Sequence, residues 1–196
     1  MTEAAQDPHE DQVLVEAVLG GDRASFGSLV ERYQGRLIRF LARLLGSDDE
    51  AQDVAQEVFI KVYQALDRYD ARYRFSTWLF RVGQNAAIDR LRRRRVRGVS
   101  LHIPGEGAED ERTWELPADG PDPYARVRSD ERGRAVREAV AELPWEYREL
   151  ILLRHYAELA YAEIAELKDL PLGTVKNKLF RARRMLEEKL GSEWLG

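Results

Sequence analysis

The side chains of greatest chemical interest in this 196-residue chain are arginines crowded into one short segment. Five of the six residues from Arg92 to Arg97 are arginine, and nine arginines accompany a single acid between Arg72 and Arg97. A guanidinium group is planar and permanently charged, and its fork of N–H donors matches the oxygens of a phosphate. The segment therefore indicates non-covalent binding of phosphates, as in a nucleic acid backbone.

A second basic segment lies near the end of the chain. From Lys168 to Lys189 there are seven bases and three acids, whereas Glu106 to Asp122, between the two basic segments, holds seven acids and one base. The net charge of −4 therefore conceals strong local fields of opposite sign. One charged run alone usually marks a solvated helix face. Two basic runs on separate helical elements favour nucleic acid binding instead.

The composition argues against an enzyme, a metalloprotein or a membrane protein. The chain has no cysteine, and its histidines, at positions 9, 102 and 155, have no metal-ligand spacing. There is no glycine-rich phosphate loop, and Asp53 and Glu57 lie one helical turn apart near the expected solvent face. No apolar run approaches the roughly 18 residues of a membrane span, and the acidic N-terminus lacks a secretory pattern. We expect a cytoplasmic protein with no catalytic residue, metal or cofactor.

Helical periodicity covers most of the chain outside its middle. Apolar residues recur every three or four positions in three segments of the first part: Phe26 to Leu44, about Asp48 to Leu66, and near Ser76 into the arginine segment. Asp22 is placed to cap the start of the first helix, and Gly46 to cap its end. No alternating pattern supports a strand. The sequence therefore predicts an all-α protein.

The periodicity stops after residue 98 and resumes near Ser129, a good helix N-cap. The stretch from Gly98 to Val127 holds four prolines, four glycines and the acid cluster, which is typical of an irregular linker. We therefore predict two small helical domains, over residues 1–98 and 129–196, joined by an irregular acidic linker over residues 99–128. Pro144 is expected in the first turn of a helix of the second domain.

Residues 161–190 have the spacing of a helix-turn-helix. Ala165 is small enough for two helices to cross closely, Asp169 stands where the turn needs a left-handed residue, and Pro171 can open the next helix. In this motif the N-terminal half of the second helix reaches base edges in the major groove. The side chains expected to face outward there are Thr174, Lys176, Asn177, Lys178 and Arg181. DNA binding is favoured over the alternative of a helical hairpin with a basic face.

These segments together resemble a known family. The promoter-reading domain of the extracytoplasmic-function (ECF) sigma factors of bacterial RNA polymerase is similar to ELPWEYRELILLRHYAELAYAEIAELKDLPLGTVKNKLFRARRML. The polymerase-clamp helix of the family is similar to DDEAQDVAQEVFIKVYQALDRYD, and the segment that follows it in members is similar to FSTWLFRVGQNAAIDRLRRRRV. The resemblance covers both domains in order and is greatest to the sigma-E-type stress-response members. Lys168 and Asp169 depart from the commoner leucine-glycine pair.

The resemblance implies an all-α sigma factor that binds core RNA polymerase, at its clamp and flap, and promoter DNA, both duplex and single-stranded. Residues expected to bind the minus-ten element are Tyr69, Arg81, Gln84, Asn85, Arg92, Arg93, Arg94 and Arg95. Residues expected to bind the minus-thirty-five element are Arg154, Thr174, Lys176, Asn177, Lys178 and Arg181. Residues expected to bind the polymerase are Asp53, Gln56 and Glu57. An anti-sigma factor, free or membrane-anchored, is the implied regulatory partner.

Within this assignment the roles differ. The arginines would anchor phosphates, with Arg81, Gln84, Asn85 and Arg92 on one helix face, whereas Tyr69 and Asn85 would receive a flipped base. The plainer alternative for Tyr69 is that its ring covers the core, and Trp78 is expected to be core. The acidic linker would thread toward the polymerase active-site channel or act only as a solubilising tether.

One further class of protein competes with the sigma factor reading. A conventional helix-turn-helix repressor or activator would share the C-terminal domain. Such a protein needs a dimerisation or ligand domain, and an acidic-then-basic helical first domain fits that need poorly.

Overall fold

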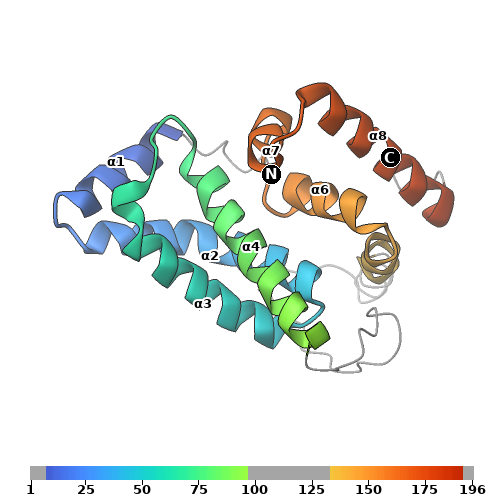
Figure 1. Ribbon diagram of the computed structural model, residues 1–196, viewed down its shortest axis with the longest axis horizontal. Helices are drawn as coiled ribbons and strands as arrows, with labels where there is room; N and C mark the ends of the chain where they lie inside the picture. The colour runs from blue at the N-terminus through green and yellow to red at the C-terminus, as the bar shows by residue number, and fades with distance from the viewer. Residues whose placement is uncertain (1–7, 97–132, 192–196) are drawn as a thin grey trace, which may run out of the picture.

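The computed structural model describes residues 8–96 and 133–191 (Figure 1). Within these ranges all regular structure is helical, without a strand, so the all-α prediction is confirmed. The N-terminal unit comprises α1 (Pro8–Leu19), α2 (Ala24–Leu45), α3 (Asp48–Gln64), the 3-10 turn η1 (Leu66–Arg68) and α4 (Phe75–Val96). The C-terminal unit comprises a helix over residues 133–141, then α6 (Trp145–His155), α7 (Tyr161–Lys168) and α8 (Leu172–Leu190).

Several predicted features lie outside the described residues, namely the linker over 99–128, the cap at Ser129 and Arg97. The side chain of Arg95 also lies outside them. Within the described ranges, no helix is both long and apolar enough to cross a membrane.

Local capping explains where α2 and α3 begin and end. The Asp22 carboxylate accepts hydrogen bonds from the Ala24 backbone N–H (3.0 Å) and the Ser25 hydroxyl (2.7 Å), which lower the pKa of Asp22. Gly46 ends α2 in the left-handed conformation, with φ of 70°. The Ser47 hydroxyl then caps α3 by accepting the Glu50 N–H at 3.3 Å. The two helices are therefore joined by a tight turn, as their sequence predicts.

The core of the N-terminal unit forms where α2, α3 and α4 pack against one another. Leu37 and Phe40 of α2 are fully buried, and the Phe40 ring meets the edge of Phe80 at 5.4 Å between centroids. Gly83 allows α4 to cross α2 closely, because a Cβ atom there would lie 2.9 Å from Cδ1 of Leu37. This packing fixes the position of α4, the helix that carries the arginine segment.

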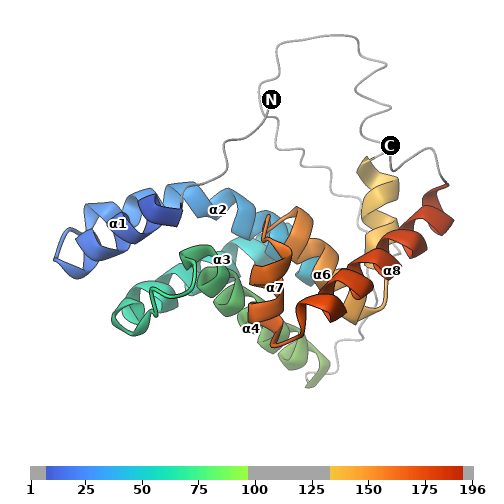
Figure 2. The same ribbon diagram turned by 90° about the horizontal axis from the view of Figure 1, so that it is seen from above.

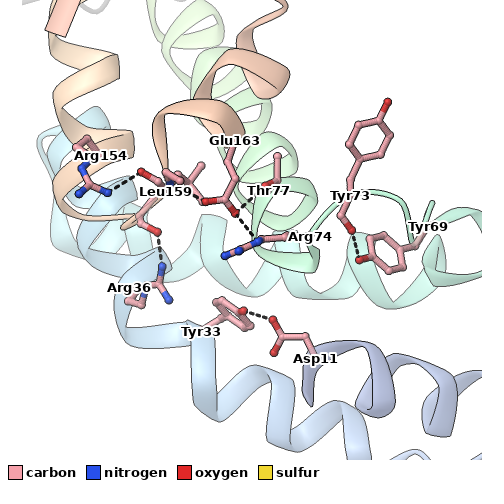
Figure 3. Close-up of polar contacts among 12 residues, drawn as sticks. Asp11, Tyr33, Arg36, Tyr69, Tyr73, Arg74, Thr77, Arg154, Leu159 and Glu163 are labelled. Atoms are coloured by element: carbon pink, nitrogen blue, oxygen red, sulfur yellow. Dashed lines mark hydrogen bonds and ion pairs between the residues drawn. The ribbon is translucent and has the colours of Figure 1, made fainter. Parts of the chain in front are cut away.

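Helix α1 is held on α2 by a buried carboxylate. Asp11 accepts a hydrogen bond from the Tyr33 hydroxyl (Figure 3). It also pairs with Arg32 at 2.7 Å. Burial and the neighbouring carboxylate raise the pKa of Tyr33, so the phenol stays protonated and donates. The three helices predicted for this part of the chain do not include α1, which is an additional element.

The C-terminal unit contains the predicted helix-turn-helix. Helix α7 ends at Asp169, which has φ of 52° and ψ of 48°, so the predicted left-handed residue is confirmed. The chain then turns, with the Leu170 N–H donating to the Ala165 carbonyl at 3.0 Å, and Pro171 precedes α8. The residues that α8 buries are the predicted ones: Val175, Leu179, Ala182 and Leu186.

The left-handed turn gives a stability prediction. Because aspartate adopts this conformation at a cost and glycine does not, Asp169→Gly is expected to raise the free energy of unfolding by about 1 kcal/mol. Asp169→Val should lower it, because a β-branched side chain is strained there. Urea unfolding followed by circular dichroism measures both changes. A loss of stability in the glycine variant would mean that the aspartate side chain itself holds the turn.

The two units pack against each other through α2 and α4 of the first unit and α6 and α7 of the second. Helix α6 packs on α2, and α7 packs on α4, so the helix-turn-helix lies beside the helix of the arginine segment (Figures 1 and 2). The sequence predicts two domains but not this contact.

Candidate nucleic-acid interface

The outer face of α8 is the first part of the candidate interface. Lys176, Asn177 and Arg181 are exposed on the N-terminal half of the second helix of the helix-turn-helix, where the motif meets the major groove. Thr174 and Lys178 are half-buried, and the Lys178 ammonium group is paired with Glu146 of α6. The structure therefore places the five predicted side chains between the start and the middle of α8, and three of them are open to solvent.

Phe180 is a residue of this face that the sequence analysis missed. Its side chain is 63% exposed, directly beside Arg181. An exposed phenylalanine on such a helix is suited to contact the methyl group of a thymine. The sequence could have indicated its exposure, because Phe180 lies one residue outside the buried stripe of α8.

Arg154 supports the loop that precedes α7. Its Nη1 donates to the Leu159 carbonyl at 3.1 Å (Figure 3). Its guanidinium carbon lies 5.5 Å from the centroid of the Tyr161 ring. Burial, Arg183 and Arg154 together lower the pKa of His155, so this histidine adds little positive charge at neutral pH. A phosphate contact by Arg154 stays a prediction. The guanidinium group that would make it already contacts the Leu159 carbonyl and the Tyr161 ring.

The predicted minus-ten face of α4 is divided between two environments. Asn85 and Arg92 are exposed, and Arg92 pairs with Asp89 at 2.8 Å. Gln84 is only 3% exposed, and its Nε2 donates to Glu149 Oε2 at 2.7 Å. The expectation of one shared solvent face is therefore corrected.

Arg81 lies on the same inner side of α4 as Gln84. Its Nη2 donates to the Glu166 carbonyl at 2.9 Å, on α7. The physical reason for the division is that α6 and α7 pack along this side of α4, which helical periodicity alone does not reveal.

The arginine segment is divided in a similar way. Arg92 and Arg93 are exposed, whereas Arg94 forms a close ion pair with Glu50 and donates to the Leu45 carbonyl at 3.1 Å. Arg94 thereby ties α4 to the end of α2 and the start of α3. It serves the fold in this structure, while Arg92 and Arg93 present their charges to solvent.

The loop between η1 and α4 contains the predicted stacking residue. The Tyr69 hydroxyl donates to the Tyr73 carbonyl at 2.5 Å (Figure 3). The centroids of the Tyr69 and Trp78 rings lie 5.2 Å apart. Burial raises the pKa of Tyr69 to about 12, so the phenol remains a donor. Trp78 is partly buried against the core, as expected. Tyr69 thus has the core-covering position that was the plainer alternative.

Tyr73 is the aromatic residue of this loop that the sequence analysis missed. Its ring is 40% exposed, with the Arg72 guanidinium 6.0 Å from the ring centroid. An exposed ring beside a cation is suited to stack on a base. The sequence could have indicated Tyr73 as a stacking residue, because it is a second tyrosine in the loop and lies between two arginines.

The predicted polymerase-binding residues lie together on one face of α3. Asp53, Gln56 and Glu57 are all exposed there. One turn further along is Ile60, which is 57% exposed. Its position outside the buried stripe of α3 was the signal that could have added it to the set. The face therefore combines negative charge with an exposed apolar side chain, a pairing suited to protein–protein contact.

Comparison with known proteins identifies the family. Residues 29–97 match the family model of Sigma-70 region 2, and residues 133–186 match that of Sigma-70 region 4. The ECF RNA polymerase sigma factor SigW of Bacillus subtilis is 34% identical over 177 residues, 90% of this chain and 94% of SigW. The ECF RNA polymerase sigma-E factor of Escherichia coli K12 is 37% identical over 180 residues, 92% of this chain and 94% of that protein.

Solved structures agree in fold. CnrH, solved in complex with the cytosolic domain of CnrY, aligns over 93% of this chain and 98% of its own, with a TM-score of 0.68 and 24% identity. RpoE from Bartonella quintana aligns over 84% of this chain and 96% of its own, with a TM-score of 0.63 and 23% identity. The chain therefore belongs to the ECF family of RNA polymerase sigma factors, the proteins that direct the polymerase to promoters.

Proposed function

We propose that this sigma factor binds promoter DNA through two separate surfaces and core polymerase through a third. The minus-thirty-five surface is the exposed half of α8, with Lys176, Asn177 and Arg181. The minus-ten surface is α4 with its preceding loop, where Asn85 and Tyr73 are accessible. The observation that carries the proposal is the exposed basic face of α8 in a helix-turn-helix whose turn has the required left-handed residue.

The domain division belongs to this proposal. Residues 1–98 would act on the polymerase and the minus-ten element, and residues 129–196 on the minus-thirty-five element. The separate matches to sigma region 2 and sigma region 4 support this division.

The chain itself performs no catalysis in this proposal, because the polymerase carries out phosphodiester chemistry. Within residues 8–96 and 133–191, no three histidine, aspartate or glutamate side chains gather as a metal site. The place of action is the cytoplasm, where promoter DNA and polymerase meet. An anti-sigma factor is the proposed regulator, supported by CnrH and RpoE, which were solved with CnrY and with the anti-sigma factor NepR.

The polymerase-binding surface gives a direct test of the proposal. Reversing the charge of two exposed acids of α3, with Asp53→Lys and Glu57→Lys, should weaken binding to purified core polymerase about tenfold or more, because charges on an interface rim guide and hold the partner. Transcription of genomic DNA by core polymerase plus the chain, followed by mapping of transcript starts, should lose its sigma-dependent starts in parallel.

The matched control carries the same change of charge elsewhere. Glu16→Lys and Glu31→Lys alter exposed acids of α1 and α2, so their double variant should bind core polymerase like the wild type. Circular dichroism confirms that both double variants keep their helices. Undiminished binding by the α3 variant would remove Asp53 and Glu57 from the interface.

A further inference from the structure

The two tyrosines of the loop over residues 69–74, between η1 and α4, have opposite environments. The Tyr69 ring is half-buried beside Phe75, with 6.0 Å between the ring centroids, and Phe75 is fully buried in the core of the N-terminal unit. The Tyr73 ring is exposed and points away from that core (Figure 3). The Tyr73 ring is therefore the one that a base can reach.

The hydroxyl group of Tyr69 joins the two residues. It donates to the Tyr73 carbonyl at 2.5 Å (Figure 3). The packing of the Tyr69 ring does not need this group, because a phenylalanine at position 69 would fill the same space against the core. The hydroxyl group therefore adds a contact that serves the loop rather than the core.

The other hydrogen bonds of the loop also hold Tyr73. The Tyr73 N–H donates to the Asp70 carbonyl at 3.0 Å, which closes a turn, and the Arg72 N–H donates to Asp70 Oδ1 at 3.0 Å. Together with the bond from the Tyr69 hydroxyl, these contacts give both backbone polar groups of Tyr73 a partner within the loop. The backbone that carries the Tyr73 ring is thus fixed by contacts within the protein alone.

Asp70 also fixes a cation beside the exposed ring. Its Oδ2 accepts hydrogen bonds from Arg72 Nε at 2.9 Å and from Arg72 Nη2 at 2.5 Å, and bonding to Arg72 lowers the pKa of Asp70. The Arg72 guanidinium carbon lies over the Tyr73 ring, 6.0 Å from its centroid. Because the cation lies over one face of the ring, a stacking base would use the other face.

This geometry suits a base that has left its stack. An aromatic side chain stacks on the flat face of a base, and that face is covered by the neighbouring bases in a duplex. A ring whose backbone is already fixed also loses little freedom when the base binds, so more of the stacking energy appears as affinity. The loop is therefore prepared for one unpaired base of a single strand.

We propose that Tyr69 is a positioning residue for minus-ten recognition, whose hydroxyl group holds the Tyr73 carbonyl so that the Tyr73 ring stacks on one unpaired base. The inference rests on the proposed function of α4 and its preceding loop. It gives Tyr69 a part in DNA binding through Tyr73, without contact between the Tyr69 ring and a base. Position 69 then accepts phenylalanine for folding but not for minus-ten affinity.

The first test removes the hydroxyl group and keeps the ring. Tyr69→Phe should weaken binding of the full chain to a single-stranded minus-ten oligonucleotide, from a promoter mapped in the transcription experiment. The expected loss is roughly 5- to 30-fold, which corresponds to ordering the backbone of one residue on binding. It should be the same at low and high salt, because no charge is removed. Fluorescence anisotropy measures the affinity, and an affinity equal to that of the wild type would overturn the proposal.

A double-mutant cycle shows whether Tyr69 acts through Tyr73. Tyr73→Ala removes the stacking ring and should weaken binding to the same oligonucleotide about 5- to 150-fold. In a chain that carries Tyr73→Ala, Tyr69→Phe should have no further effect, because no ring is left to position. Losses that multiply as if the two residues were independent would overturn the positioning role.

An abasic scan of the oligonucleotide tests whether the ligand is a single base. Each base of the minus-ten element is removed in turn, with its sugar and phosphate kept. At one position the loss of the base should weaken binding by the wild type, and there Tyr69→Phe should cause no further loss. A loss from Tyr69→Phe that persists at every abasic position would overturn the proposal.

The matched control removes a hydroxyl group from another tyrosine of the N-terminal unit. Tyr63 of α3 is 40% exposed, and its ring packs on Phe26 with 4.9 Å between the centroids. Tyr63→Phe should bind the minus-ten oligonucleotide like the wild type. Circular dichroism confirms that this variant and Tyr69→Phe keep their helices. An equal loss of affinity in both variants would overturn the proposal.

Hydrogen exchange measured by NMR tests the loop without DNA. The amide hydrogens of Arg72 and Tyr73, which donate within the loop, should exchange about fivefold faster in Tyr69→Phe, whereas those of α3 should be unchanged. Unchanged exchange in the loop would overturn the positioning role whether or not the chain directs transcription. Absence of sigma-dependent transcription by the wild type would instead count against the proposed function.

Discussion

Replacing Arg181 by alanine is expected to weaken binding of the full chain to its minus-thirty-five duplex by about 1–3 kcal/mol, roughly a 5- to 150-fold increase in Kd. Arg181 is exposed near the middle of α8, on the helix that follows the left-handed turn at Asp169. At that place in a helix-turn-helix, an arginine fork can bond two acceptors of one guanine. Loss of such a contact should also relax specificity at one base position.

The measurement separates reading of a base from binding of a phosphate. Anisotropy is recorded at several salt concentrations with a duplex that the wild-type chain selects from a random library, and with a scrambled duplex. If Arg181 contacts a base, its replacement should lower the affinity for the selected duplex alone. If it contacts a phosphate, its replacement should lower the affinity for both duplexes and should flatten the salt dependence. Lys176→Ala on the same half of α8 is tested in the same way.

The control removes a cation from the last turn of the same helix. Lys189 pairs with Glu142 of the C-terminal unit and lies about 12 Å along the helix axis from Arg181. Lys189→Ala should therefore leave the affinity for the selected duplex nearly unchanged. If Arg181→Ala and Lys189→Ala have equal small effects, α8 is not docked in the groove as proposed.

Features set by neighbouring residues could be predicted from the sequence. The left-handed turn at Asp169, the buried stripe of α8 and the cap at Gly46 depend on contacts within a few residues, and all are present. The exposed set on α8 follows from the same stripe, because a helix that buries one face must present the opposite one.

Features set by distant contacts could not be predicted in this way. Periodicity places Arg81 and Gln84 on an accessible side of α4, but the C-terminal unit packs there and engages both. The sequence does not distinguish Arg94 from the other arginines of its segment, because the ion pair with Glu50 forms only in the folded chain. Helix α1 is held by Asp11, a buried carboxylate whose partner lies on α2, and such pairing across the chain leaves no periodic signal.

The position of Arg94 leads to the second large expected effect, which concerns the arginine segment. Replacing Arg92 and Arg93 together by glutamine should reduce affinity for single-stranded DNA on the order of tenfold at low salt. Both side chains are exposed at the end of α4. If each neutralises one phosphate, the slope of log K against log salt should fall by about 1.4 for a single strand. The loss should be similar for promoter and random sequences, because phosphates carry no sequence information.

Arg94→Gln supplies the contrast within the same segment. It removes one positive charge of the same type, but that charge is paired with Glu50 and bonded to the Leu45 carbonyl. Its main effect should therefore be a free energy of unfolding that is lower by on the order of 1–3 kcal/mol, because the partly buried Leu45 carbonyl loses this donor. Glu50 then keeps only the longer ion pair with Arg90, at 3.9 Å. The salt slope for single-stranded DNA should stay close to that of the wild type. Anisotropy across a salt series and urea unfolding, both on the full chain, distinguish the two classes of arginine. A salt slope lowered as much by Arg94→Gln as by one of the exposed positions would show that Arg94 leaves Glu50 to bind DNA, and that the whole segment acts as a single anchor.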